Sequence, residues 1–227
     1  MPGEAGTGVP LEQDVLELAP AEATRRATGP CEEVLFVLDG SGILRLGDED
    51  HALEPEAGAY LAPGEEYELR AGGPDPMRVV AVRIPDPVPP DRESTSRRTL
   101  VRRLADQDDQ AATTDRWFRV VADPDSGLRS ATHFVGYIPT VRAPDHFHTY
   151  DEVIYVIDGE GVIHTGGEAQ PLGPGSRIEL PARTVHCLEN TGETVMRVVA
   201  VFRPAGSPAE AYNPDGTPAY VSAAQTS

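Results

Sequence analysis

The sequence predicts an all-β protein built from two tandem copies of one β-barrel. Proline and glycine, 22 of each among 227 residues, favour tight turns and interrupt helices. Between the turns lie short runs that are rich in β-branched and aromatic side chains, as strands are. Long segments of the chain also recur at one constant offset, and such an internal repeat sets the architecture.

The repeat is visible in two matched pairs of segments that share an offset of 119 residues. Residues 32–42 reappear in similar form as residues 151–161, and the run 77–82 recurs unchanged as 196–201. Two long matches in the same register indicate two copies of one fold. We expect the two barrels to be related by a pseudo-twofold axis.

Each copy contains an apolar run that ends in Asp-Gly. The runs Val34–Leu38 and Val153–Ile157 do not alternate apolar with polar residues, so we expect strands that are covered on both faces. The pairs Asp39–Gly40 and Asp158–Gly159 that follow predict type I′ hairpin turns, in which both central residues have positive φ.

The chain divides into four segments: a first copy over 1–88, a connector over 89–112, a second copy over 113–205 and an irregular tail over 206–227. We expect the connector to be mostly irregular or helical, with a short helix over 97–105. It carries the only basic cluster of the sequence, which consists of Arg92, Arg97, Arg98, Arg102 and Arg103. Ion pairing with the acidic domains is the simpler interpretation of this cluster, and an anion or partner site is the alternative.

Charge and composition exclude several classes of function. With 19 Lys and Arg against 37 Asp and Glu, the net charge of −18 repels phosphate backbones and anionic lipids. No apolar stretch approaches the ~20 residues of a spanning helix, and the start of the chain lacks the pattern of a signal peptide. We therefore expect a cytoplasmic protein, monomeric or homodimeric, that binds a small molecule and neither nucleic acid nor membrane.

Three histidines and one glutamate of the second copy form a candidate metal site. His146 and His148 lie on the same face of an extended segment, because side chains repeat every two residues. Glu152 opens the next strand and His186 follows a turn-like segment. Three imidazoles and one carboxylate suit one divalent transition metal ion: Fe, Mn, Ni, Zn, Co or Cu. The other histidines, interpreted as satisfied surface or core residues, are His51, His133 and His164.

These residues resemble the cupin superfamily. The first motif of that superfamily is glycine, five residues, His-x-His, three or four residues, glutamate, six residues and glycine. His146, His148, Glu152 and Gly159 fall at these spacings, and Thr140 stands at the first glycine.

The second motif of the superfamily is glycine, five residues, Pro-x-Gly, two residues, histidine, three residues and asparagine. Gly175, Pro181, His186 and Asn190 match it, while Arg183 replaces the middle glycine. The resemblance covers both copies. It implies a bicupin, that is, two jelly-roll (double-stranded β-helix) barrels, with the metal site in the C-terminal barrel.

The first copy lacks the corresponding imidazoles. At the 119-residue offset, Ala27, Gly29 and Tyr67 stand where the second copy has its three histidines, and only Glu33 is kept. One carboxylate does not hold a transition metal tightly. We expect an N-terminal barrel without metal that supplies packing, a lid or a ligand surface.

Further residues are expected to complete the site. Arg183, in the turn before His186, is a candidate to clamp a substrate carboxylate, and a solvent-facing arginine is the alternative. Strand parity places Ile154, Val156 and Leu188 on the face of the ligands, where they would form apolar walls.

The resemblance leaves the reaction open. Our main hypothesis is a metal-dependent oxygenase or dioxygenase acting on a small, oxygen-rich molecule, with Glu152 and Arg183 as catalytic residues. One alternative is an isomerase, lyase or hydrolase in which the same ion is a Lewis acid. The other is a binding module or sensor without catalysis, because fold alone does not determine function.

Overall fold

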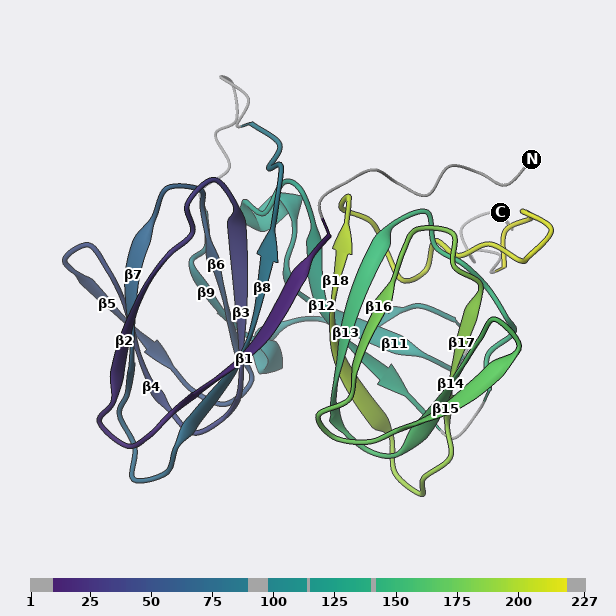
Figure 1. Cartoon of the computed structure of the whole chain (residues 1–227), viewed down its shortest axis with the longest axis horizontal. Helices are drawn as coiled ribbons and strands as arrows, with labels where there is room; N and C mark the ends of the chain where they lie inside the picture. The colour runs from purple at the N-terminus through teal and green to yellow at the C-terminus, as the bar shows by residue number, and fades with distance from the viewer. Residues whose placement is uncertain (1–9, 90–97, 114, 140–141, 220–227) are drawn as a thin grey trace. The chain divides into compact units, whose positions relative to one another are not determined.

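The computed structural model describes residues 10–89, 98–113, 115–139 and 142–219, which form antiparallel sheets and two short 3-10 helices (Figure 1). The chain forms two compact units. Of the described residues, the N-terminal unit consists of 10–107 together with 120–133, and the C-terminal unit of 108–119 together with those from 134 onward. The two tandem all-β domains are thus confirmed, while their pseudo-twofold relation stays a prediction.

The N-terminal unit contains two sheets. The order of the larger sheet is β1 (Glu12–Leu18), β8 (Met77–Ile84), β3 (Glu32–Asp39), β6 (Ala57–Leu61) and β9 (Val101–Arg103). The order of the smaller sheet is β2 (Ala23–Ala27), β7 (Glu66–Ala71), β4 (Gly42–Leu46) and β5 (Glu49–Leu53). Apolar side chains of both sheets, among them Leu35, Leu44, Leu69 and Val79, are at most 1% exposed and form one core. Burial of this core between two sheets is the main stabilising contribution.

The C-terminal unit repeats this plan. The order of its larger sheet is β10 (Gln110–Ala111), β11 (Trp117–Ala122), β12 (Thr132–Ile138), β18 (Met196–Arg203), β13 (Asp151–Asp158) and β16 (Arg177–Leu180). Of β11 and β12, residues 117–119 and 134–138 are counted in this unit. Its smaller sheet has the order β15 (Glu168–Leu172), β14 (Gly161–Thr165) and β17 (His186–Asn190). Strands β3, β4, β5 and β8 map onto β13, β14, β15 and β18 at an offset of 119 residues at both ends, which confirms the repeat.

The two apolar runs form central strands, as predicted. β3 lies between β8 and β6, and β13 lies between β18 and β16. Residues 34–37 and 153–156 are buried, while the last residue of each run, Leu38 and Ile157, is half-buried. A strand with neighbours on both edges and covered faces needs no polar alternation.

The predicted type I′ hairpins at the two Asp-Gly pairs are wrong. β3 and β4 lie in different sheets, so Asp39–Gly40 carries the chain from one sheet to the other. Only the glycine has positive φ, at 73°. A Cβ on Gly40 would lie 2.3 Å from the carbonyl oxygen of Pro76, so close backbone approach explains the glycine. The aspartate pairs with Arg78.

The connector does not form the predicted helix over its described part, 98–105. Residues 101–103 are strand β9, which adds to the edge of β6, and a 3-10 helix covers only Leu104–Asp106. The Tyr60 N–H donates to the Leu100 carbonyl at 3.0 Å, and the Leu104 N–H donates to the Glu56 carbonyl at 3.0 Å. These bonds satisfy an open sheet edge, a tertiary gain that overrides local helix propensity.

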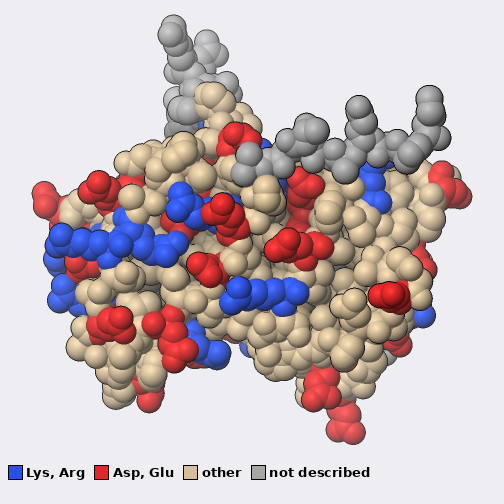
Figure 2. All heavy atoms as spheres, in the orientation of Figure 1, with Lys and Arg blue, Asp and Glu red and all other residues tan. Residues whose placement is uncertain are grey.

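The connector arginines form ion pairs, as the simpler interpretation predicted. Arg98 pairs with Glu65, Arg103 with Glu54 at 2.7 Å, and Arg102 with Asp123 at 3.9 Å. Arg92 and Arg97 lie outside the described residues. Acidic and basic side chains are interspersed on the face shown in Figure 2. Within the described ranges, no helix has the length and apolar character needed to cross a membrane.

Candidate metal centre

The four residues predicted as metal ligands come together in the C-terminal unit, at the wall of one cavity. Glu152 lies on β13, and His186 is the first residue of β17. His146 precedes β13 and forms a bridge to His186, in which each backbone N–H donates to the other residue's carbonyl, at 3.0 and 2.8 Å. This short ladder fixes the two imidazoles beside each other, and His148 follows two residues later on the same face.

Backbone carbonyls orient all three imidazole rings. Nδ1 of His146 lies 2.9 Å from the Pro144 carbonyl, and Nδ1 of His186 lies 2.9 Å from the Thr184 carbonyl. Nδ1 of His148 lies 2.9 Å from the carbonyl of Glu210 in the tail. A carbonyl only accepts hydrogen bonds, so each Nδ1 carries the proton and donates it. Each Nε2 then keeps its lone pair, which is the form that a metal ion binds.

One ring nitrogen of each histidine lies within 4.8 Å of the others. The three side chains are buried, with 5 to 7% of their surface exposed. Burial, the largest cause in each case, lowers the pKa of His146, and lowers that of His148 to about 4 and of His186 to about 3. The rings are therefore neutral at pH 7, and the cluster can hold a divalent metal ion.

Glu152 fits the same role. Its Oε2 lies 3.9 Å from Nε2 of His186, is buried, and has no hydrogen-bond partner among the described residues. Burial raises the pKa of this carboxyl to about 8. An unpartnered buried carboxylate is costly unless a cation or a proton satisfies it. A metal ion between Glu152 and the histidines would do so, and the four-residue ligand set stays a prediction.

The metal-free protein is expected to be most stable near pH 6.5. The pKa values of His148 and His186 lie far below 6.5, so the unfolded chain takes up protons that the folded chain does not, and stability is lost as the pH falls below about 6.5. Glu152 acts in the opposite sense. Its folded pKa of about 8 exceeds the ordinary 4.5, so stability is lost as the pH rises toward 8. Below about pH 6.5 the loss of stability from the histidines exceeds the gain from this single carboxyl, because more than one histidine contributes.

Denaturant unfolding of chelator-treated protein between pH 4 and 9 measures this profile. Glu152→Gln should remove the decline above pH 6.5, which amounts to about 2 kcal/mol up to pH 8. A decline of equal size in the Glu152→Gln variant would contradict the assignment.

The cavity beside the histidines has a volume of about 80 Å³ and mostly apolar walls. Ile154 and Leu188 line it, as strand parity predicted, together with Phe134 and Phe202. Val156 is buried, but it is not among the lining residues. Apolar walls exclude water and strengthen charge interactions inside the cavity.

Arg183, predicted as a substrate clamp, lies in an exposed turn and does not line this cavity. Its guanidinium lies 5.9 Å from the centre of the Phe147 ring. Its φ is 67°, the left-handed region that the cupin motif fills with glycine. The Arg183 N–H donates to the His148 carbonyl at 2.7 Å, so the turn itself supports a candidate ligand. A catalytic role of its side chain stays a prediction.

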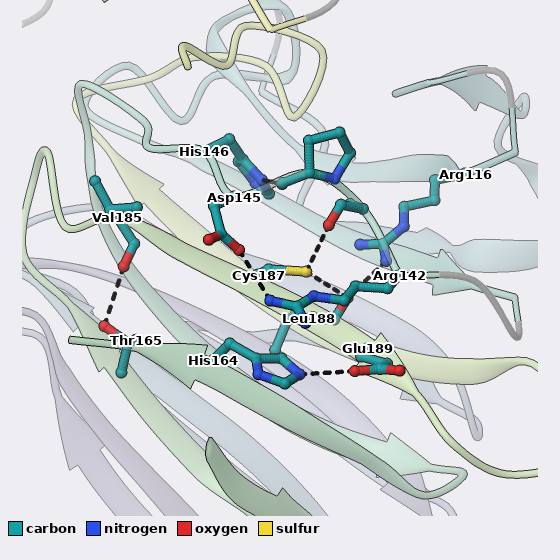
Figure 3. A network of polar contacts seen from close by, with 12 residues as sticks. Arg116, Arg142, Asp145, His146, His164, Thr165, Val185, Cys187, Leu188 and Glu189 are labelled. Atoms are coloured by element: carbon teal, nitrogen blue, oxygen red, sulfur yellow. Dashed lines mark hydrogen bonds and ion pairs between the residues drawn. The ribbon is translucent and has the colours of Figure 1, made fainter. Parts of the chain in front are cut away.

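Two contributors to the site were missed from the sequence. Arg116 lines the cavity, and its guanidinium donates to the carbonyl of Leu188 at 2.6 Å (Figure 3). The tail contributes Pro208 to the lining and the Glu210 carbonyl to His148. Arg116 belongs to neither of the two sequence motifs that pointed to the histidines. A backbone carbonyl leaves no signal in the sequence.

At the equivalent place in the N-terminal unit lies a guanidinium. Arg26 donates to Oε1 of Glu33 at 2.8 Å and to the hydroxyl of Tyr67 at 3.0 Å. Glu33 is fully buried, and its Oε2 has no hydrogen-bond partner in the described structure. Burial alone would lower the pKa of Arg26, but the hydrogen bond and charge of Glu33 raise it above its ordinary value. The absence of metal from this unit stays a prediction.

The remaining histidines are placed outside the cluster. His51 lies 3.6 Å from Glu49, and His164 lies 2.7 Å from Glu189 (Figure 3). His133 is a core residue against Phe36, and burial lowers its pKa to about 3. Its Nδ1 has no hydrogen-bond partner among the described residues, so it is buried but not fully satisfied.

Several known proteins are similar to this chain in sequence or in fold. The L-ectoine synthase of Bordetella parapertussis is 31% identical over 112 residues, which cover 48% of this chain and 84% of that protein. Among solved structures, a putative glyoxylate-induced protein of Pseudomonas aeruginosa has a TM-score of 0.74 at 20% identity, covering 86% of this chain and 75% of its own. Oxalate decarboxylase of Bacillus subtilis, studied for its Mn(II) centres, has a TM-score of 0.68 at 13% identity. The match covers 87% of this chain and 70% of that protein.

The structural likenesses are below 25% identity and show the fold alone. The family is shown by sequence. The Cupin domain family matches residues 14–83 and again residues 133–202, one match in each copy of the repeat and together more than half of the chain. The chain belongs to the cupin family, and it is a bicupin.

Proposed function

We propose that this bicupin is a metal-dependent enzyme of the lyase type that acts on a small, oxygen-rich organic molecule. The observation that carries the proposal is the cluster of three neutral imidazoles beside a buried carboxylate without a hydrogen-bond partner, at the wall of an apolar cavity. A purely structural cluster of this kind would leave Glu152 unsatisfied.

His146, His148, His186 and Glu152 would hold one divalent transition metal ion. When bound, such an ion supplies a Lewis acid that polarises an oxygen atom of the substrate. The identity of the metal is open among Fe, Mn, Ni, Zn, Co and Cu. The Mn(II) centres of the structurally similar oxalate decarboxylase support a redox-capable or hard divalent ion at this position of the fold.

The protein's own groups would prepare the site for this chemistry. The three carbonyl acceptors keep the rings in the tautomer that binds a cation, so no proton has to leave before the ion enters. Glu152 has a second carboxylate oxygen that would be available to take up a proton from the substrate. Ile154, Leu188 and Phe202 exclude water from the reacting atoms.

Relatives favour lyase chemistry over the dioxygenase hypothesis. L-ectoine synthases from Bordetella and Hahella chejuensis match about half of this chain at 29 to 32% identity, and this group of cupins consists of lyases. The dioxygenase hypothesis finds no support among these relatives. We therefore place the non-redox alternative first.

Turnover is expected to persist without oxygen and to require the metal. The assay supplies a panel of small organic acids, with oxalate and L-ectoine included, to protein purified without added metal. Substrate loss is followed by mass spectrometry in air and under argon. Chelation should abolish the loss, and the original metal should restore it, with equal rates in both atmospheres. A rate that vanishes under argon would instead support an oxygenase, and binding without consumption would indicate a sensor.

A further inference from the structure

Arg116 is held rigidly at the edge of the metal cavity. It directly precedes β11, where its N–H donates to the hydroxyl of Thr113 at 3.1 Å and its carbonyl accepts from the Ala112 N–H at 2.9 Å. Its side chain is half-buried, and the bond to the Leu188 carbonyl directs the guanidinium across β17 (Figure 3). Backbone and side chain are thus both fixed, so little conformational entropy remains to be lost on binding.

The charge of Arg116 is exceptional within the cavity. Of the described residues that line it, Arg116 is the one that has a guanidinium. Apart from the four candidate metal ligands, the other lining side chains carry no charged group. The guanidinium thus places a fixed positive charge at the cavity wall, in a chain whose net charge is −18. A positive charge at the wall of a cavity favours entry of an anion.

The chemistry of a guanidinium selects the class of anion. Its planar N–H groups match the two oxygens of a carboxylate, and apolar neighbours such as Phe118 and Phe134 strengthen this attraction by excluding water. The cavity of about 80 Å³ restricts the ligand to a small molecule. We propose that Arg116 binds the carboxylate of the substrate, and hence that the substrate is a small carboxylic acid. This inference rests on the proposed function, in which a metal ion held by the histidines would act on the same substrate.

The test compares oxalate with its uncharged diamide, oxamide, as probes of the metal-loaded protein. Isothermal titration calorimetry should show oxalate binding weakened about ten- to a hundredfold by Arg116→Met, with metal content and melting temperature measured on the same samples. Arg116→Lys should recover part of the affinity, because lysine keeps the positive charge but lacks the paired N–H donors of the guanidinium. Oxamide affinity should change less than about twofold.

Arg119 provides the matched control. It lies on β11, three residues after Arg116, pairs with Asp109 at 2.6 Å, and does not line the cavity. Arg119→Met should leave oxalate binding unchanged. If Arg116→Met lowers the melting temperature sharply, Arg116→Gln serves as the second neutral variant.

Failure of this inference and failure of the proposed function give different results. Normal metal content with wild-type oxalate affinity in the neutral Arg116 variants would overturn the inference alone. Protein that never retains metal would overturn the proposed function. The Arg116 comparison is then made on the metal-free protein, since a guanidinium needs no ion to bind a carboxylate. Oxalate binding to neither form of the wild type would also overturn the inference.

Discussion

Replacing His148 with alanine is expected to weaken binding of the divalent metal more than about 100-fold, so that the purified variant contains almost none. Loss of a residue that only supports a ligand already costs about 10- to 100-fold in metal affinity, and His148 is one of three imidazoles whose nitrogens lie within 4.8 Å of one another. The metal content of protein purified without added metal, together with titration against a competing chelator, measures the effect.

His164→Ala is the matched control for this variant. His164 belongs to the same unit and is also beside a glutamate, but it pairs with Glu189 on the smaller sheet, outside the cluster. Its metal content should equal that of the wild type. The site assignment would be refuted by a His148→Ala protein that keeps its metal, or by a loss of equal size in His164→Ala.

The histidine cluster could be predicted because its determinants are local. His146 and His148 are two residues apart, which places them on one face of an extended segment. The spacing of the motifs adds Glu152 and His186. The duplication of the fold could be predicted for a similar reason, since one offset relates strands β3, β4, β5 and β8 to β13, β14, β15 and β18. These features depend on periodicity, which a single sequence displays.

Features that depend on tertiary partners could not be predicted. Strand β9 forms because β6 has an open edge, and nothing in the local sequence 101–103 reports that edge. Arg183 was a candidate clamp because it lies close to His186 along the chain, but its side chain is exposed and does not line the cavity. Arg116 reaches the cavity from the position just before β11, and nothing in the local sequence reports that this position faces the histidines.

Arg26→Met is expected to destabilise the protein by about 3 kcal/mol, the effect of removing one partner from a buried ion pair. The substitution leaves the carboxylate of Glu33, which is fully buried, without its guanidinium, and the hydroxyl of Tyr67 without its donor. The melting temperature should fall by roughly 10 °C. Arg25→Met is the control on the same strand. The side chain of Arg25 is 88% exposed and its pair with Glu68 lies at the surface, so little change is expected.

A double variant separates the orphaned charge from lost packing. If the cost of Arg26→Met comes from the unpaired carboxylate, then adding Glu33→Leu should restore most of the stability, because an apolar pair of similar volume replaces a buried ion pair at little cost. If instead the guanidinium contributes mainly through its contacts, the double variant will be no more stable than Arg26→Met. Recovery would indicate that Arg26 acts in the N-terminal unit as a built-in cation for Glu33. In the C-terminal unit, no arginine of the described residues pairs with Glu152 at the matching position, and the expected cation is the metal ion.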